Sequence, residues 1–191
     1  MILIQVNARA EQAMREFLEA LGVDLKARGM EQTPARVAKM YAYLFSGMDR
    51  DTQDIWGETF PTGSQGLVAV RHIPFYSMCE HHLVPFFGTV DIVYLPHEGR
   101  VAGFSKFTQL VERLAHQPQL QERLTAQIAH AVARDLQAEG VLVRMEALQL
   151  CMTMRGDMAP GTRTVTSEAL GACRKEHELY EQAWLALGGE K

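Results

Sequence analysis

The sequence predicts an α+β fold, in which a four-stranded antiparallel sheet carries helices on one face and follows an N-terminal helical extension. Three observations lead to this prediction. Apolar residues recur at helical spacing before residue 49, and β-branched and apolar residues cluster or alternate from residue 67 onward. The later elements run in the order strand, strand, helix, helix, strand, strand. With 191 residues, 47% of them hydrophobic, the chain can form one domain with a substantial core.

Two amphipathic helices are predicted in the N-terminal part. The first carries an apolar stripe from Ala10 to Leu21, with Asn7 available as its cap. The second begins at Thr33-Pro34, where a capping residue precedes a first-turn proline, and its apolar stripe stops at Gly47. We therefore expect a pair of short helices before the sheet begins.

An irregular segment with several glycines and prolines, residues 49–65, is predicted to be a loop. We accordingly divide the chain into an N-terminal helical region with its linker, 1–65, and a sheet domain, 66–191. The elements predicted in the sheet domain are strands at 67–75 and 89–95, helices at 105–114 and 118–136, strands at 141–151 and 162–167, and a C-terminal helix at 180–187. Four strands leave two open edges, so a closed oligomeric β-barrel made from several chains is expected.

The net charge and composition of the chain exclude several classes of protein. A formal net charge of −4 argues against a general nucleic-acid binder, which normally carries a basic stripe. The sequence has no apolar run long enough to cross a bilayer, and its start lacks the features of a secretion signal, so we expect a cytoplasmic protein without a membrane partner. Three widely separated cysteines do not form a disulfide framework.

The run Cys79-Glu80-His81-His82 concentrates a thiol, a carboxylate and two imidazoles. Cys79 and His82 are spaced so that a tight turn can place both on one ion, and a thiolate with an imidazole favours zinc. Cys151, at the end of a predicted strand, is the best candidate for a third ligand. Three protein ligands leave the fourth position of a tetrahedral ion open, as in hydrolytic or lyase centres. The alternative is a cysteine and histidines that pack without metal.

Five motifs along the chain together resemble GTP cyclohydrolase I. The resemblance covers nearly all of the chain after about the first twenty residues, and five motifs in the same order are far more specific than any one of them. The motifs are Thr33-Pro34-Ala35-Arg36-Val37-Ala38-Lys39-Met40, Tyr76-Ser77-Met78-Cys79-Glu80-His81-His82, Gly103-Phe104-Ser105-Lys106, Pro118-Gln119-Leu120-Gln121-Glu122-Arg123 and Cys151-Met152-Thr153-Met154-Arg155-Gly156.

This resemblance implies a fold, a reaction and a set of site residues. It implies the tunnelling fold, with subunit sheets joined into a barrel, a homodecamer with active sites at subunit boundaries, and a Zn²⁺ cofactor. The implied reaction converts GTP to 7,8-dihydroneopterin triphosphate and formate, the first step toward folate or other pterins. The implied residues are Cys79, His82 and Cys151 for zinc; His81 as acid or base and Glu80 as a proton relay; Glu122 with Gln121 for guanine; and Arg36, Lys39, Ser105, Lys106 and Arg155 for the triphosphate.

Two residues depart from the family pattern. Gln149 stands where the family has a histidine assigned as proton donor to the purine, and strand alternation predicts that Gln149 faces the metal with Cys151. Gln109 stands where the family has an arginine directed at the phosphates. Three hypotheses follow: an active enzyme in which neighbours compensate, a diverged purine nucleotide hydrolase that stops at a ring-opened formamidopyrimidine, and a zinc-containing oligomeric regulatory subunit with little turnover.

Overall fold

The computed structural model describes residues 7–63, 65–154 and 160–188. The chain forms two compact units, Met1–Ser46 and Gly47–Lys191. This division falls earlier than the expected boundary at residue 65. The reason is that the segment after Ser46 contributes buried residues, Ile55 and Trp56, to the core of the second unit.

The N-terminal unit contains the two predicted helices, α1 (Ala8–Ala20) and α2 (Thr33–Leu44). The predicted cap is confirmed, because the Asn7 side chain accepts a hydrogen bond from the Arg9 amide at 2.9 Å. The apolar sides of α1 and α2 pack together, and α2 buries Pro34 and Ala38.

The segment predicted to be a loop contains regular structure, so that prediction is wrong in part. It forms the short helix α3 (Gln53–Trp56) and the strand β1 (Thr59–Pro61), which pairs antiparallel with β4 (Arg100–Ala102) after a single turn of 3-10 helix, His97–Gly99. Elements of three or four residues are too short to show a periodicity in sequence. Contacts with distant parts of the chain stabilise them.

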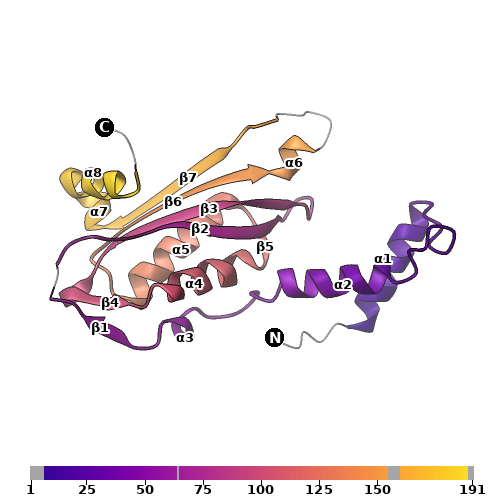
Figure 1. The fold of residues 1–191 in the computed structure, drawn as a ribbon, viewed down its shortest axis with the longest axis horizontal. Coiled ribbons are helices and arrows are strands. Elements are labelled where there is room, and N and C mark those ends of the chain that lie inside the picture. Colours follow the sequence, from indigo (N-terminus) through magenta and orange to yellow (C-terminus); the bar gives the residue numbers. More distant parts are fainter. Residues whose placement is uncertain (1–6, 64, 155–159, 189–191) are drawn as a thin grey trace. The chain divides into compact units, whose positions relative to one another are not determined.

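The main sheet has five strands in the order β5-β2-β3-β6-β7 (Figure 1). The four predicted strands pair antiparallel, and a short fifth strand pairs parallel with the end of β2. The sheet is therefore mixed, and the prediction of a purely antiparallel four-stranded sheet is corrected. The strands are β2 (Val68–Cys79), β3 (Pro85–Leu95), β5 (Pro118–Gln119), β6 (Gly140–Gln149) and β7 (Thr164–Gly171).

The fifth strand replaces the expected start of a helix. We predicted that the longer helix begins at Pro118, but Pro118 and Gln119 pair with Met78 and Cys79, and helix α5 (Gln121–Asp135) begins after them. A proline has no N–H to donate, which suits the edge of a sheet as well as the first turn of a helix. The local pattern could not distinguish these two uses.

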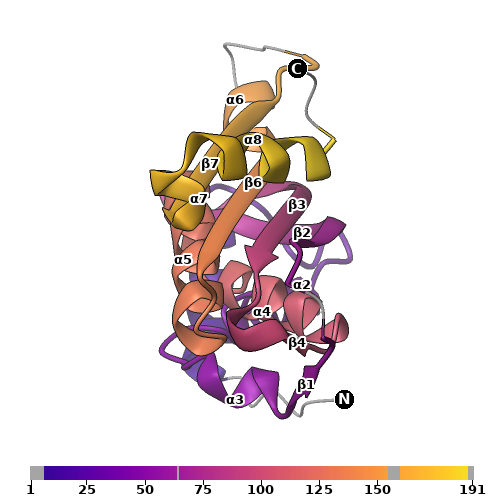
Figure 2. The same cartoon turned by 90° about the vertical axis from the view of Figure 1, so that its left-hand side faces the viewer.

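Helices cover both faces of the sheet, which corrects the prediction of helices on one face (Figure 2). Helices α4 (Ser105–Ala115) and α5 pack on the face that presents Val90, Ile92 and Tyr94, all fully buried as their alternation predicted. The opposite face is covered near its end by α7 (Ala172–Lys175) and α8 (His177–Ala186), which form a second, smaller core. The buried residues of that core are Val93, Leu142, Cys173, Ala183 and Leu187.

No helix within residues 7–63, 65–154 and 160–188 is both long enough and apolar enough to cross a bilayer.

Candidate metal centre

The turn between β2 and β3 brings Cys79 and His82 together. The Leu83 amide donates to the Cys79 carbonyl oxygen at 2.8 Å, and the Cys79 amide donates to the Val84 carbonyl oxygen at 2.9 Å. Leu83 adopts a left-handed conformation with φ of 51°, which is uncommon for a residue with a branched side chain. The tight turn places Cys79 Sγ at 3.9 Å from His82 Nδ1.

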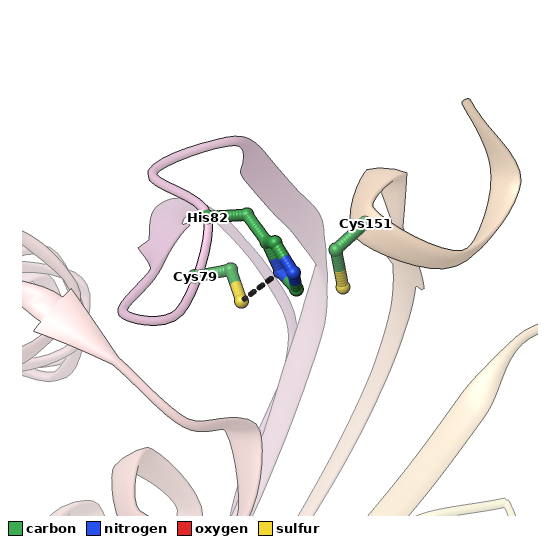
Figure 3. Close-up of side chains that lie close together, drawn as sticks. All are labelled: Cys79, His82 and Cys151. Atoms are coloured by element: carbon green, nitrogen blue, oxygen red, sulfur yellow. Dashed lines mark hydrogen bonds between the residues drawn. The ribbon is translucent and has the colours of Figure 1, made fainter. Parts of the chain in front are cut away.

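Cys151 reaches the same place from β6. Strand β6 pairs with β3 so that Gln149 lies opposite Phe86, next to the turn. We expected Cys151 to lie in this strand, but β6 ends at Gln149 and Cys151 belongs to the short helix α6 (Leu150–Thr153). The side chains of Cys79, His82 and Cys151 point toward one another (Figure 3).

The donor atoms of these three residues fit a metal ion. They lie within 4.8 Å of one another. A tetrahedral zinc ion with bonds of about 2.0–2.3 Å would hold such atoms about 3.5–3.8 Å apart, so small side-chain rotations suffice. Cys79 is buried, Cys151 is half-buried and His82 is exposed, which leaves one side of the cluster open. In the described part of the chain no other group of three such residues occurs.

Glu80 and His81 lie between Cys79 and His82 in the chain, and Arg123 holds Glu80. The Glu80 carboxylate forms an ion pair with the Arg123 guanidinium, and its other oxygen is 3.9 Å from His81 Nε2. Arg123 also donates to Gln119 Oε1 at 2.9 Å. No role was predicted for Arg123 from the sequence. Its position in the motif, directly after Glu122, was the available signal.

The side chains of Gln149 and Gln121 are in contact, although the two residues are far apart in the sequence. Gln149 Nε2 donates to Gln121 Oε1 at 2.7 Å. The Gln121 side chain is only 4% exposed and is fully engaged inside the protein. The side-chain amide of Gln121 is therefore occupied by contacts inside the protein, and the expected contact of this residue with guanine stays a prediction. Glu122, the next residue, is exposed in the first turn of α5.

Ser105, Lys106 and Gln109 lie in the first half of α4, away from the cluster of the same chain. The last residue of this helix, Ala115, accepts a hydrogen bond from Ser77 at 2.7 Å, two residues before Cys79. A helix rises about 1.5 Å per residue, so Ser105, the first residue of α4, lies about 15 Å from Ala115 along the helix axis. Ser105 and Gln109 are exposed, and Lys106 is half-buried. One chain does not gather these residues at its own metal centre.

Two of the remaining predicted phosphate contacts belong to the N-terminal unit. Arg36 and Lys39 are exposed on α2, in the N-terminal unit, and lie on one side of that helix because their spacing is three residues. Arg155 lies outside the described residues.

The chain is similar to a set of named proteins over nearly its whole length. A family model described as GTP cyclohydrolase I matches residues 10–187. A relative from Streptococcus suis named GTP cyclohydrolase 1 is 48% identical over 172 residues, which cover 90% of this chain and 92% of the relative. Relatives of the same name from Streptococcus agalactiae and Geobacillus kaustophilus are each 49% identical, covering 91% and 86% of this chain and 92% and 87% of their own lengths.

Proposed function

The chain belongs to the GTP cyclohydrolase I family, and we infer that it is an enzyme that hydrolyses GTP in pterin and folate biosynthesis. The products that this reaction gives are 7,8-dihydroneopterin triphosphate and formate. The observation that carries the proposal is the cluster of Cys79, His82 and Cys151 in a chain whose relatives match it over about nine tenths of its length.

We assign the cluster to zinc. Two thiols and an imidazole are the soft and borderline donors that zinc prefers, and three protein ligands leave one position open. When bound, a zinc ion supplies a Lewis acid that makes water nucleophilic near neutral pH. All three cysteines of the protein are free thiols, and zinc-binding thiols require a reducing compartment, so we place the enzyme in the cytoplasm.

His81 and Glu80 supply the proton chemistry in this proposal. The His81 side chain is 63% exposed and lies directly beside the cluster, where its ring can meet a substrate. Arg123 holds one oxygen of Glu80, and the other oxygen lies 3.9 Å from His81 Nε2, which places a carboxylate next to the imidazole. Histidine is the side chain that most often serves as a general acid or base in catalysis. Glu122 is an acceptor suited to the ring N–H and amino group of guanine.

We further propose that each active site is shared between copies of the chain. Ser105 and Lys106 have the chemistry to bind a triphosphate, as do Arg36, Lys39 and Arg155. Ser105, at the start of α4, lies about 15 Å along the helix axis from the end that contacts β2, so a neighbouring copy is needed to bring Ser105 and Lys106 to the cluster. Strand β7 is an edge strand available for pairing between chains. A homodecamer of the tunnelling fold, with its sheets joined into a barrel, meets both requirements.

Gln149 favours one alternative within the same family fold. The carboxamide of Gln149 cannot exchange a proton near neutral pH. The step that depends on protonation of the purine ring is therefore the one that this replacement slows most. A diverged enzyme would then stop at a ring-opened formamidopyrimidine and release no formate. A regulatory subunit that binds zinc but turns over little is the third hypothesis.

Product analysis separates these alternatives. We expect zinc-loaded protein incubated with GTP to release formate and to give the fluorescence of an oxidised pterin. The Cys151→Ala variant should lose bound zinc and this activity, whereas the matched variant Cys173→Ala, in the second core, should keep both. A ring-opened product without formate would establish the diverged hydrolase, and unconsumed GTP with zinc bound would contradict an enzymatic function.

A further inference from the structure

A chain of buried side-chain amides ends at the metal centre, and its direction can be deduced from backbone groups. Gln121 Nε2 donates to the carbonyl oxygens of Met145 at 3.3 Å and Thr164 at 3.1 Å. A backbone carbonyl oxygen can only accept, so the nitrogen of the Gln121 amide must lie on this side. The oxygen of the same amide must therefore lie on the other side, toward Gln149.

The orientation of Gln121 fixes that of Gln149. Gln121 Oε1 can only accept, and it receives hydrogen bonds from Gln149 Nε2 at 2.7 Å and from the Thr164 hydroxyl. Gln149 Nε2 also lies 3.4 Å from Thr164 Oγ1. The Gln149 nitrogen is thus held inward, and its oxygen Oε1 is left facing Cys151 Sγ at 4.0 Å. Reversing the Gln149 amide would place two acceptor oxygens against each other.

This arrangement decides what Gln149 can offer at the metal centre. Its exposed end is a carbonyl oxygen, which accepts hydrogen bonds and carries no proton. Every member of the chain, Gln121, Gln149 and Thr164, is neutral at all ordinary pH values, so the orientation does not change with protonation. Gln121 is 4% exposed, and its hydrogen bonds to the Met145 and Thr164 carbonyl oxygens hold one orientation of its amide.

We propose that Gln149 is a positioning residue that presents a fixed hydrogen-bond acceptor to the metal centre, and that Gln121 sets this direction. The inference rests on the proposed function in that it takes Cys79, His82 and Cys151 to be the metal ligands. In this role Gln149 orients a water molecule or a substrate N–H beside Cys151. It does not donate a proton to the purine ring, and the proton donor is therefore another group, for which His81 is in position.

Zinc affinity tests the proposal without any measurement of turnover. Groups that orient the surroundings of a metal typically change its affinity 10- to 100-fold when they are removed. We expect Gln149→Met and Gln121→Met each to weaken zinc binding of the full-length protein by about tenfold in competition with a chelator. The double variant should bind zinc no more weakly than the single variant with the lower zinc affinity, because both changes remove the same oriented oxygen.

A matched control separates orientation from general damage to the cluster. Thr125 is 1% exposed and donates to the Gln121 backbone oxygen at 2.8 Å, and it reaches the Gln121 side chain only through Thr166, on the nitrogen side of the amide, away from the oxygen that accepts from Gln149. Thr125→Val should lower stability and leave zinc affinity unchanged. Unchanged zinc affinity in Gln149→Met, or additive losses in the double variant, would overturn the proposal.

If Gln121→Met does not fold, Gln149→Met still tests the proposal. Gln149 is half-buried at the end of its strand, so its replacement disturbs the core less. The outcome is also independent of the proposed reaction. A protein that consumes no GTP but loses zinc affinity in the coupled manner would retain this inference while the proposed function fails. Normal GTP turnover with zinc affinity insensitive to Gln149 would do the reverse.

Discussion

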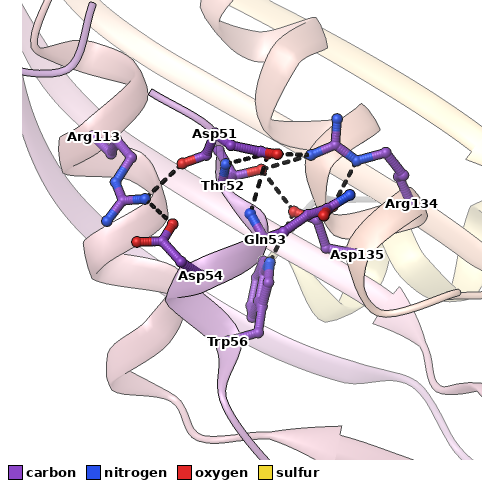
Figure 4. Close-up of polar contacts among 8 residues, drawn as sticks. All are labelled: Asp51, Thr52, Gln53, Asp54, Trp56, Arg113, Arg134 and Asp135. Atoms are coloured by element: carbon purple, nitrogen blue, oxygen red, sulfur yellow. Dashed lines mark hydrogen bonds and ion pairs between the residues drawn. The ribbon is translucent and has the colours of Figure 1, made fainter. Parts of the chain in front are cut away.

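The two ends of helix α5 carry polar clusters of opposite character. At its first residues lies the amide cluster, which is neutral and consists of Gln121, Thr125, Gln149, Thr164 and Thr166. At its last residues lies the charged cluster (Figure 4), which consists of Asp51, Thr52, Asp54, Trp56, Arg113, Arg134 and Asp135. The first adjoins the cluster of Cys79, His82 and Cys151, and the second attaches residues 51–56, the α3 segment, to helices α4 and α5.

Asp135 is the centre of the charged cluster. Its side chain is 1% exposed, and it accepts hydrogen bonds from Thr52 Oγ1 at 2.6 Å, Trp56 Nε1 at 2.9 Å and Arg134 Nε at 2.6 Å. Burial by itself would raise the pKa of the Asp135 carboxyl. The hydrogen bonds from Arg134, Thr52 and Trp56 outweigh burial, so the pKa of Asp135 lies below its ordinary value.

The difference shows two ways of using buried hydrogen bonds. A carboxylate with three donors gives strong attachment, because charge-assisted hydrogen bonds are about twice as strong as neutral ones, but the attachment depends on pH. Neutral amides and hydroxyls attach less strongly, yet each has a fixed donor end and a fixed acceptor end. The neutral cluster can therefore specify a direction beside a metal centre at any pH, and the charged cluster cannot.

Removing the central carboxylate should have the largest effect. Asp135→Ala leaves the Thr52 hydroxyl and the Trp56 ring N–H without their buried acceptor, and we expect the free energy of unfolding to fall by about 3 kcal/mol. Urea unfolding followed by the fluorescence of the two tryptophans, Trp56 and Trp184, measures this loss. Zinc affinity should not change, since the metal ligands lie at the other end of α5. Wild-type stability in this variant would show that the charged cluster does not attach the α3 segment.

Placing a titratable group in the amide cluster should have the next largest effect. In Gln149→His, Gln121 Oε1 can accept from one ring nitrogen, which leaves the other ring nitrogen facing Cys151. A positioned general acid contributes about 10²- to 10⁴-fold to a rate. Because His81 already carries protons in our proposal, we expect kcat for GTP to rise by less than this range, about tenfold. An unchanged kcat would mean that purine protonation does not limit the reaction.

The pH dependence of stability should distinguish the two clusters most directly. Thr166→Val removes hydrogen bonds with Gln121 and Thr125, and we expect a loss of about 1 kcal/mol that is the same from pH 7 to pH 3. Asp135→Asn should behave differently. Because the folded pKa of Asp135 is lowered, its contribution is complete above the unfolded pKa of 3.8 and is lost as the pH falls through the folded pKa.

The measurement is chemical unfolding of the wild type and both variants at each pH. Comparison with the wild type at every pH is needed because His116 also titrates. Burial lowers the pKa of His116, so its contribution is complete above about pH 6.5 and declines as the pH falls below that value. A loss in Thr166→Val that varied with pH would show that the amide cluster is coupled to a charge.

The cluster of Cys79, His82 and Cys151 could be predicted from the sequence because its chemistry is local or lies within a motif. Cys79 and His82 share one turn, and Cys151 was the best candidate for a third ligand because it ends a predicted strand, in agreement with the family resemblance. The longer helices and the main strands were predictable for a similar reason, since their apolar spacing is repeated over several turns. The strand at Pro118 and the elements α3 and β1 were not, because two to four residues carry no periodicity.

The polar clusters could not be predicted because they join residues far apart in the chain. Thr52 and Asp135 are 83 positions apart, and Gln149 and Gln121 are 28 apart. Gln121 illustrates the consequence. Its place beside Glu122 suggested a contact with substrate, and only the folded chain shows that the amide points inward, where two backbone carbonyl oxygens hold it. Sequence identifies such a residue as important, whereas its direction depends on tertiary packing.

The smallest effect should come from the exposed margin of the charged cluster. Asp54 is 69% exposed and pairs with Arg113, which also donates to the Asp51 carbonyl oxygen. The Arg113 hydrogen bonds hold the pKa of Asp54 below its ordinary value, but water competes for an exposed pair and salt screens it. Asp54→Asn should therefore shift the urea midpoint less than Thr166→Val does, and the shift should vanish in high salt. A larger shift that persists in salt would mean that charge at the surface, and not the buried Asp135, attaches the α3 segment.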